Sequence, residues 1–175
     1  MGTGNWLDFA GYFKEGFTRV RVDKKWNYIG KDGKLLSSHW FDLCMPFNGD
    51  FGAIMIQNRW NYIGKDGKLL SPTWFDRCDD FSGGFGVVEL NMKHNHIDNK
   101  GNLLSDVWFD WCGVFREGFA VVKLDDKKNY IGEDGKLLSD TWFDFCFSFG
   151  EGFAEVAMHG KAYYIDKEGG LHGHR

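Results

Sequence analysis

The sequence is short of proline, of positive charge and of long apolar runs. It has 175 residues with two prolines, and its formal net charge of −4 lacks the basic excess of a nucleic-acid-binding surface. No apolar stretch approaches the roughly 18 residues of a membrane-spanning helix, and no charged start followed by an apolar run marks a secretory signal. We therefore expect no nucleic-acid partner, no membrane partner and a cytoplasmic location.

The sequence also lacks the short motifs of common enzymes and cofactor sites. It contains no nucleophile elbow, no glycine-rich phosphate loop and no HExxH pattern. The histidines share no repeated position, and metal binding would need further ligands that the sequence does not indicate. They are His39, His94, His96, His159, His172 and His174. We expect a protein that is not an enzyme and that uses no metal or cofactor.

What the chain does have is a 34-residue repeat. One tryptophan, one aspartate and two phenylalanines recur at this spacing in five copies, which occupy residues 6–39, 40–73, 74–107, 108–141 and 142–175. The recurring residues are Trp6, Trp40, Trp74, Trp108 and Trp142; Asp8, Asp42, Asp76, Asp110 and Asp144; Phe13, Phe47, Phe81, Phe115 and Phe149; and Phe17, Phe51, Phe85, Phe119 and Phe153. A fixed period of 20 to 50 residues is typical of solenoids, propellers and arrays. We predict a single repeat domain over residues 1–175.

Each copy reads as a small antiparallel meander. In the first copy, alternation over residues 17–22 predicts a strand, residues 26–30 a second, residues 34–37 a third, and residues 40–44 a short fourth. The pair Asp32-Gly33 predicts a type I′ hairpin turn, in which both central residues have positive φ. No segment shows a helical apolar period of useful length, so the predicted fold class is all-β.

The first strand of each copy has one face that begins with a small residue, as in Thr18, Gly52 and Ala120. A strand that needs a small residue there is approached closely by a neighbour. The opposite face varies more between copies, from Arg19 to Ala53, and we expect it to be partly exposed. A single meander cannot bury both faces, so the copies must stack.

Two architectures accommodate such units. We predict a closed five-bladed β-propeller, with an open twisted β-solenoid as the alternative. The copies begin with the fourth-strand segment, residues 6–10, and end after the third-strand segment near Leu171. Pairing the N-terminal segment with the last copy would close the ring and remove both exposed sheet edges.

Two further positions of the repeat, one with cysteine and one with aspartate, recur at the same 34-residue spacing. Cysteine fills one column in four copies and Ala10 fills it in the first, and we expect buried, reduced thiols, because equivalent positions in successive repeats lie too far apart for a disulfide. These are Cys44, Cys78, Cys112 and Cys146. Reduced thiols favour a reducing compartment. We expect the aspartate column to accept hydrogen bonds from turns or neighbouring strands; the alternative is a ring of carboxylates that holds a cation.

Residues that only some copies have are better candidates for binding. Not every copy has a tryptophan at the positions of Trp26, Trp60 and Trp111, so the shared core does not require tryptophan there. Aromatic residues with arginine nearby are typical of binding hot spots. The arginines in question are Arg19, Arg21 and Arg59. The alternative for the three tryptophans is peripheral packing between repeats.

The combined pattern resembles a known repeat family. Residues 115–122 read Phe-Arg-Glu-Gly-Phe-Ala-Val-Val and residues 128–136 read Lys-Asn-Tyr-Ile-Gly-Glu-Asp-Gly-Lys, which is similar to the bacterial WG, or KWG, repeat. All five copies share the resemblance, although the signature Trp-Gly is Trp26-Asn27 and Trp60-Asn61 here. The resemblance implies a bacterial or phage-related β-repeat module for interaction, with no general catalytic site.

The sequence therefore predicts a non-catalytic binding module that acts through protein–protein contacts. The alternative is a multivalent carbohydrate-binding lectin with one site per repeat, which near-identical copies such as residues 27–37 and 61–71 would also fit.

Overall fold

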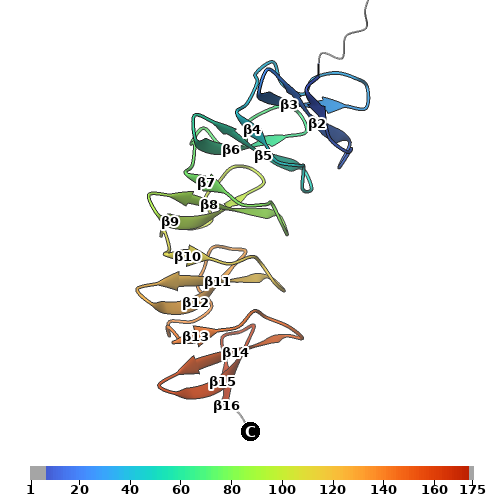
Figure 1. Cartoon of the computed structure of the whole chain (residues 1–175). Helices are drawn as coiled ribbons and strands as arrows, with labels where there is room; N and C mark the ends of the chain where they lie inside the picture. The colour runs from blue at the N-terminus through green and yellow to red at the C-terminus, as the bar shows by residue number, and fades with distance from the viewer. Residues whose placement is uncertain (1–6, 174–175) are drawn as a thin grey trace, which may run out of the picture. The chain divides into compact units, whose positions relative to one another are not determined.

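The computed structural model describes residues 7–173, which form β-strands and no helix. The strands make five antiparallel sheets, so the all-β prediction is confirmed. Each repeat contributes a short strand and two long ones, which Figure 1 labels in chain order. The short strands are β1 (Phe9–Ala10), β4 (Leu43–Cys44), β7 (Arg77–Cys78), β10 (Trp111–Cys112) and β13 (Phe145–Cys146). The long pairs are β2 (Phe17–Val22) with β3 (Lys25–Gly30), β5 (Phe51–Ile56) with β6 (Arg59–Gly64), β8 (Phe85–Leu90) with β9 (Lys93–Asp98), β11 (Phe119–Leu124) with β12 (Lys127–Gly132), and β14 (Phe153–Met158) with β15 (Lys161–Asp166).

The strand order within each sheet follows the sequence. The orders are β1-β2-β3, β4-β5-β6, β7-β8-β9, β10-β11-β12 and β13-β14-β15-β16, where β16 is Leu171–Gly173. The chain divides into two compact units. The first holds the described residues up to Ser82 together with Asn99–Gly101, and the second holds Gly83–Asp98 and the described residues from Asn102 onward. Closure into a ring stays a prediction. Trp6, which belongs to the predicted closing segment, lies outside the described residues, and Phe9–Ala10 of that segment pair with β2.

The type I′ turn lies elsewhere than predicted. Val22 pairs with Lys25, and the two residues between them, Asp23 and Lys24, have φ of 48° and 66°. Positive φ at both central positions defines a type I′ turn. At the predicted position only Gly33 has positive φ (77°), and its amide donates to Gly30 O at 3.0 Å. The prediction of a type I′ turn at Asp32-Gly33 was therefore wrong, because Asp32 does not adopt positive φ.

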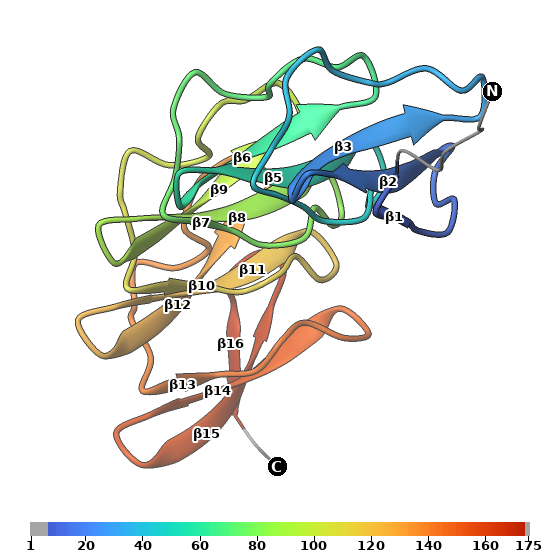
Figure 2. The same cartoon turned by 45° about the horizontal axis from the view of Figure 1, so that its top comes forward.

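The predicted third strand shrinks to a single bridge in the first copy. Leu35 bridges Ile29, Leu36 N donates to Tyr28 O at 2.9 Å, and the chain then leaves the sheet. The second, third and fourth copies show the same bridge. Figure 2 shows the segments after β3 and β6 looping away from the sheets. Only in the last repeat does this segment form a strand, β16, which pairs with β15 from Tyr163 to Ile165.

A buried asparagine explains why the segment leaves the sheet. Asn27 is fully buried, and its Nδ2 donates to Ser37 O at 2.8 Å and to His39 O at 3.1 Å. Its Oδ1 accepts from Tyr28 N at 2.8 Å. Asn61, Asn95 and Asn129 make the same three bonds. Asparagine at the position where the family signature has glycine thus anchors the loop that carries the chain to the next repeat.

The core lies between repeats as well as within them. Val20, Ile54 and Val122 are buried on one face of their strands, as predicted. The opposite face is also buried in the inner copies, at Ala53 and Val121 among others, so the expectation of partial exposure was wrong there. The small residue at the start of the first face is required at Gly52, where an added Cβ would lie 2.5 Å from the Tyr28 hydroxyl of the preceding repeat.

Candidate functional site

The first unit brings Trp26, Arg19 and Arg21 together. The two guanidinium carbons lie 5.5 and 5.6 Å from the centroid of the Trp26 ring, within the range of cation–π contacts. Phe9 meets the same indole edge to face at 5.4 Å. Arg19 Nη1 also donates to Cys44 O of the next repeat at 2.9 Å. All three predicted site residues are partly buried, so much of this cluster serves packing.

Trp60 and Arg59 also serve structure in part. Trp60 N donates to Phe75 O at 2.8 Å, and Phe75 N donates back to Trp60 O at 2.8 Å. These two bonds join β6 to the segment that begins the next repeat. Arg59 forms an ion pair with Asp76 and donates to Trp74 O at 2.9 Å.

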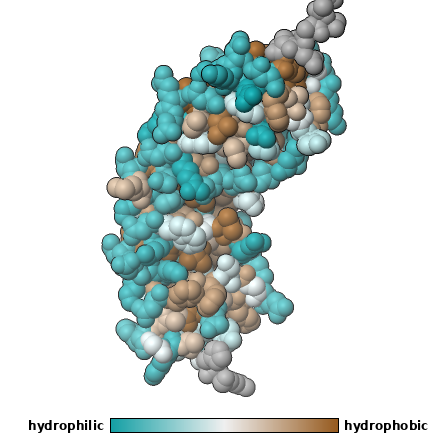
Figure 3. Space-filling view, viewed as in Figure 1, coloured by the Kyte–Doolittle hydropathy of each residue, from teal (hydrophilic) through white to brown (hydrophobic). Residues whose placement is uncertain are grey.

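Trp111 lies in the second unit and is the most exposed of the predicted tryptophans. Its side chain is 47% exposed at the start of β10, opposite Lys123. Phe145, one repeat later at the same position of β13, is 44% exposed. Lys128 Nζ lies 3.9 Å from the Phe145 centroid, and the Phe147 ring lies 4.8 Å from it. Sequence reasoning missed Phe145, although its 34-residue spacing from Trp111 was a usable signal. Figure 3 shows apolar atoms at the surface of the C-terminal repeats, over the region of β10 to β15.

The aspartate column joins successive repeats, as its hydrogen bonds show. Asp42 accepts from the turn amide of Gln57 at 2.6 Å and pairs with Lys25 of the preceding repeat. Both contacts lower the pKa of Asp42, with the Lys25 bond as the larger cause. Three more pairs follow this pattern: Arg59–Asp76, Lys93–Asp110 and Lys127–Asp144. The turn-binding interpretation is confirmed for Asp42, Asp110 and Asp144.

The four cysteines are buried free thiols, as predicted. Burial raises the pKa of Cys112 and of Cys146 to about 12 and that of Cys44 further. Such thiols are protonated and poorly reactive. Burial also lowers the pKa of His96, whose Nε2 lies 2.7 Å from Gly113 O. Among residues 7–173 no group of three or more His, Cys, Asp or Glu side chains is arranged to hold a metal ion.

Each pair of neighbouring repeats within a unit is joined by an aromatic contact. The ring of Phe47 packs against two rings of the preceding repeat, Phe17 at 5.1 Å and Tyr28 at 4.8 Å. We call the inserted phenylalanine the plug and the two receiving residues the socket. Phe81, Phe115 and Phe149 are plugs in the same way.

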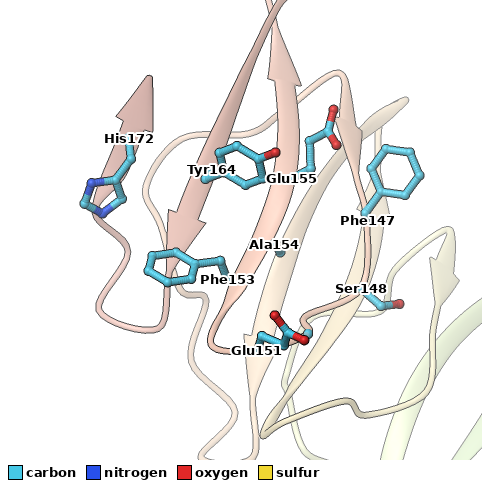
Figure 4. A pocket seen from close by; sticks show the side chains of 9 residues that line it. Phe147, Ser148, Glu151, Phe153, Ala154, Glu155, Tyr164 and His172 are labelled. Carbon is cyan, nitrogen blue, oxygen red and sulfur yellow. The ribbon is translucent and has the colours of Figure 1, made fainter. Parts of the chain in front are cut away.

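The fifth socket, formed by Phe153 and Tyr164, opens into a hollow of about 770 Å³. Figure 4 shows both rings beside this hollow, with Phe147, Glu151 and Glu155 around it. Tyr164 is 37% exposed, whereas Tyr28 in the first socket is 1% exposed. Sequence reasoning did not identify this hollow, because Phe153 and Tyr164 occupy the same columns as residues that are covered in other repeats.

Comparison with known protein families identifies the family of the chain. Its sequence matches the WG containing repeat over residues 7–26, 62–93, 97–127 and 130–161, which is more than half of its length. The chain belongs to the WG-repeat family. The resemblance found in the sequence is therefore confirmed. No curated protein matches this WG-repeat protein.

Several solved structures are similar to this WG-repeat protein at low identity. Hsv2 from Kluyveromyces lactis is 13% identical with a TM-score of 0.44, over 90% of this chain and 58% of that one. A protein of unknown function from Bacteroides caccae is 16% identical with a TM-score of 0.34, over 94% and 79%. PorZ, a surface component of the type-IX secretion system of Porphyromonas gingivalis, is 7% identical with a TM-score of 0.36, over 94% and 26%. The chain thus spans less than two thirds of Hsv2 and about a quarter of PorZ.

Proposed function

We propose that this WG-repeat protein is a non-catalytic binding module that holds a protein partner through Trp111 and Phe145. Exposed aromatic side chains at equivalent positions of two successive repeats support this proposal most directly. Exposed apolar patches on a folded chain mark interaction sites, and tryptophan is prominent among binding hot spots. Within residues 7–173 no helix is present that could cross a membrane.

The charges around these rings indicate the chemistry of the partner. Lys123 lies opposite Trp111 in the sheet, and Lys128 covers the Phe145 ring. A partner that brings an apolar side chain flanked by carboxylates would bury the rings and pair with the lysines. Such rim charges mainly affect association rate and salt dependence.

A lectin with one site per repeat remains the alternative, and the composition of this column weighs against it. A lectin of that kind needs an equivalent aromatic platform in every copy. The column instead reads Phe9, Leu43, Arg77, Trp111 and Phe145. Binding that depends on the second unit alone fits a protein partner better than equivalent glycan sites.

The experiment compares Trp111→Ala with a matched control, Arg77→Ala, which removes the residue at the same position of another repeat. Proteins cross-linked to the full chain in the cells that produce it are identified for each variant. We expect Trp111→Ala to lose at least one specific partner that Arg77→Ala retains. Unchanged capture by Trp111→Ala would refute the proposed surface. Titration of a glycan panel with a stoichiometry above one per chain would support the lectin instead.

A further inference from the structure

We propose that a hollow between the first and second repeats is a binding site for a small carboxylate with an apolar body, held by Lys14 and Arg19. Every residue that lines this hollow belongs to the first unit. The site involves neither Trp111 nor Phe145, so its test is independent of the proposed function.

The hollow has aromatic walls and a small volume. Phe17 and Tyr28 of the first repeat and Phe47 of the second line it, and its volume is about 180 Å³. The Phe47 ring packs against the other two at 5.1 and 4.8 Å, so the joint between these repeats fixes the walls. Pockets for drug-sized ligands measure about 300–1,000 Å³, so this hollow suits a single side chain or a small acid.

Three residues around the hollow are not required by the repeat. Tyr12, Lys14 and Arg19 line it, and each occupies a position that differs from copy to copy. The equivalent residues are Pro46, Asp80, Val114 and Ser148 for Tyr12; Asn48, Ser82, Arg116 and Gly150 for Lys14; and Ala53, Val87, Val121 and Glu155 for Arg19. Only the first copy combines an aromatic ring with two cations at these three positions. Because the fold of the repeat does not demand this combination, a ligand is the better explanation for it.

The two cations have no counter-charge in the part of the chain that the structure describes. Neither Lys14 nor Arg19 has an ion-pair partner among residues 7–173, and none of the described residues that line the hollow is acidic. Burial raises the pKa of the Tyr28 hydroxyl and of the Cys44 thiol, so both groups near Arg19 are neutral. An anion that enters the hollow would therefore meet two positive charges and no negative one.

Arg19 is held in place before any ligand binds. Its Nη1 donates to Cys44 O at 2.9 Å, and its guanidinium carbon lies 5.5 Å from the centroid of the Trp26 ring. A guanidinium has five N–H donors, of which the bond to Cys44 uses one. The backbone of Lys14 is also fixed, because Lys14 N donates to Phe17 O at 2.8 Å and Phe17 N donates back at 3.1 Å. Groups that are ordered in advance lose less conformational freedom when a ligand binds.

The aromatic walls determine the class of anion. Inorganic phosphate has oxygen atoms on every side, and the rings would leave several of these oxygens without a donor. A carboxylate has its charge at one end, so that end can meet Lys14 and Arg19 through charge-assisted hydrogen bonds while an apolar body lies against Phe17 and Phe47. The carboxylate can belong to a free acid or to the end of a peptide chain, and the experiment distinguishes the two sources.

The experiment titrates the isotope-labelled full chain with benzoate at constant ionic strength and follows the backbone amides by NMR. We expect saturable shifts at the amides of residues 12–19 and 45–47. Benzamide, which has the same shape without the charge, should bind about tenfold more weakly. Inorganic phosphate should not displace benzoate. N-acetylglycylphenylalanine represents a peptide end: tighter binding than benzoate indicates a peptide source, and weaker binding indicates a free acid.

The test variants introduce residues that the second repeat already has at the same positions. Arg19→Ala copies Ala53 and should weaken benzoate binding about tenfold, because a hydrogen bond to a charged group is lost. Lys14→Asn copies Asn48 and should weaken it in the same direction. The control is Lys24→Asn, the same change at an exposed residue of the turn between β2 and β3. The second repeat has Asn58 there, with φ of 62° against 66° at Lys24, so this variant should bind benzoate as the wild type does.

Several outcomes would overturn the proposal. They are the absence of saturable shifts at these amides, equal binding of benzoate and benzamide, and wild-type binding in both Lys14→Asn and Arg19→Ala. Displacement of benzoate by phosphate would also overturn it, because the hollow would then accept anions of any kind. Lys14 is exposed, so Lys14→Asn remains a valid test even if Arg19→Ala loosens the contact with Cys44.

Discussion

Replacing Asn61 with alanine should destabilise the first unit more than any exposed asparagine could. The Asn61 side chain is fully buried and makes three hydrogen bonds: Nδ2 to Ser71 O at 2.8 Å and to Thr73 O at 3.2 Å, and Oδ1 from Tyr62 N at 2.8 Å. A hydrogen bond contributes about 1 kcal/mol net, so the loss should be about 3 kcal/mol. For a chain of this size that corresponds to a fall in Tm of about 6–12 °C.

The assay is urea unfolding followed by tryptophan fluorescence, with Asn99→Ala as the control because Asn99 is exposed. Amide exchange adds local resolution, since the Tyr62 amide and the loop from Ser71 to Thr73 should lose protection first. A change of less than about 0.5 kcal/mol in Asn61→Ala, the usual range for surface substitutions, would refute the anchoring role of the asparagine.

Asn61→Asp separates the two halves of this contact. The variant keeps the Oδ1 acceptor for Tyr62 N but turns the donor toward Ser71 O and Thr73 O into a second acceptor. At neutral pH a buried carboxylate would face two carbonyl oxygens, which costs more than an absent bond. We expect Asn61→Asp to be less stable than Asn61→Ala at pH 7, and equal stability would mean that the donated bonds matter little.

Two further substitutions test the joints between repeats. Gly52→Val should lower the free energy of unfolding by about 1–3 kcal/mol, because its Cβ would lie 2.5 Å from the Tyr28 hydroxyl; Gly52→Ala should cost less, and urea unfolding that ranks the two the other way round would contradict the steric argument. Asp144→Asn should make the free energy of unfolding depend less on pH in the acid range. The Lys127 pair lowers the folded pKa of Asp144, so this carboxylate stabilises the fold above its ordinary pKa and the stabilisation is lost as pH falls through the lowered value. Unfolding measured from neutral to acid pH checks this, and a wild-type slope in Asp144→Asn would show that the pair does not stabilise the fold.

The long strands could be predicted from sequence because their signal is local and is repeated five times. Alternation fixed residues 17–22 correctly, and the second strand was placed within one residue of its observed start at Lys25. The type I′ turn was assigned to Asp32-Gly33 because glycine is the usual signal of positive φ, whereas Asp23 and Lys24, between the two long strands, adopt it at both central positions. The Asp42 carboxylate compensates by binding the equivalent turn of its own repeat at Gln57 N, a contact that joins residues 15 apart and leaves no local signature.

The candidate site was harder to predict, because burial at equivalent positions depends on the neighbour and not on the residue. Trp26 and Trp111 both appear as copy-specific tryptophans, yet Trp26 packs with two arginines while Trp111 is nearly half exposed. Phe13 and Phe47 are likewise equivalent in the repeat and differ in whether a preceding repeat receives them. The repeated residues show which contacts a repeat can make. The structure is needed to show which of these residues are covered by a neighbouring repeat and which are exposed.

The fifth repeat contains a natural counterpart of the asparagine experiment. Tyr163 occupies the column of Asn27 and Asn61, and a phenol cannot donate to two loop carbonyls while it accepts from the backbone. In this repeat the third segment stays beside β15, where Leu171 to Gly173 pair with Ile165 to Tyr163. In the repeats that have asparagine, the equivalent segment makes one bridge and then crosses to the next repeat. The segment thus leads onward in the repeats with asparagine at this position and ends as a strand in the repeat with tyrosine. Loss of the Asn61 amide should reveal the same dependence.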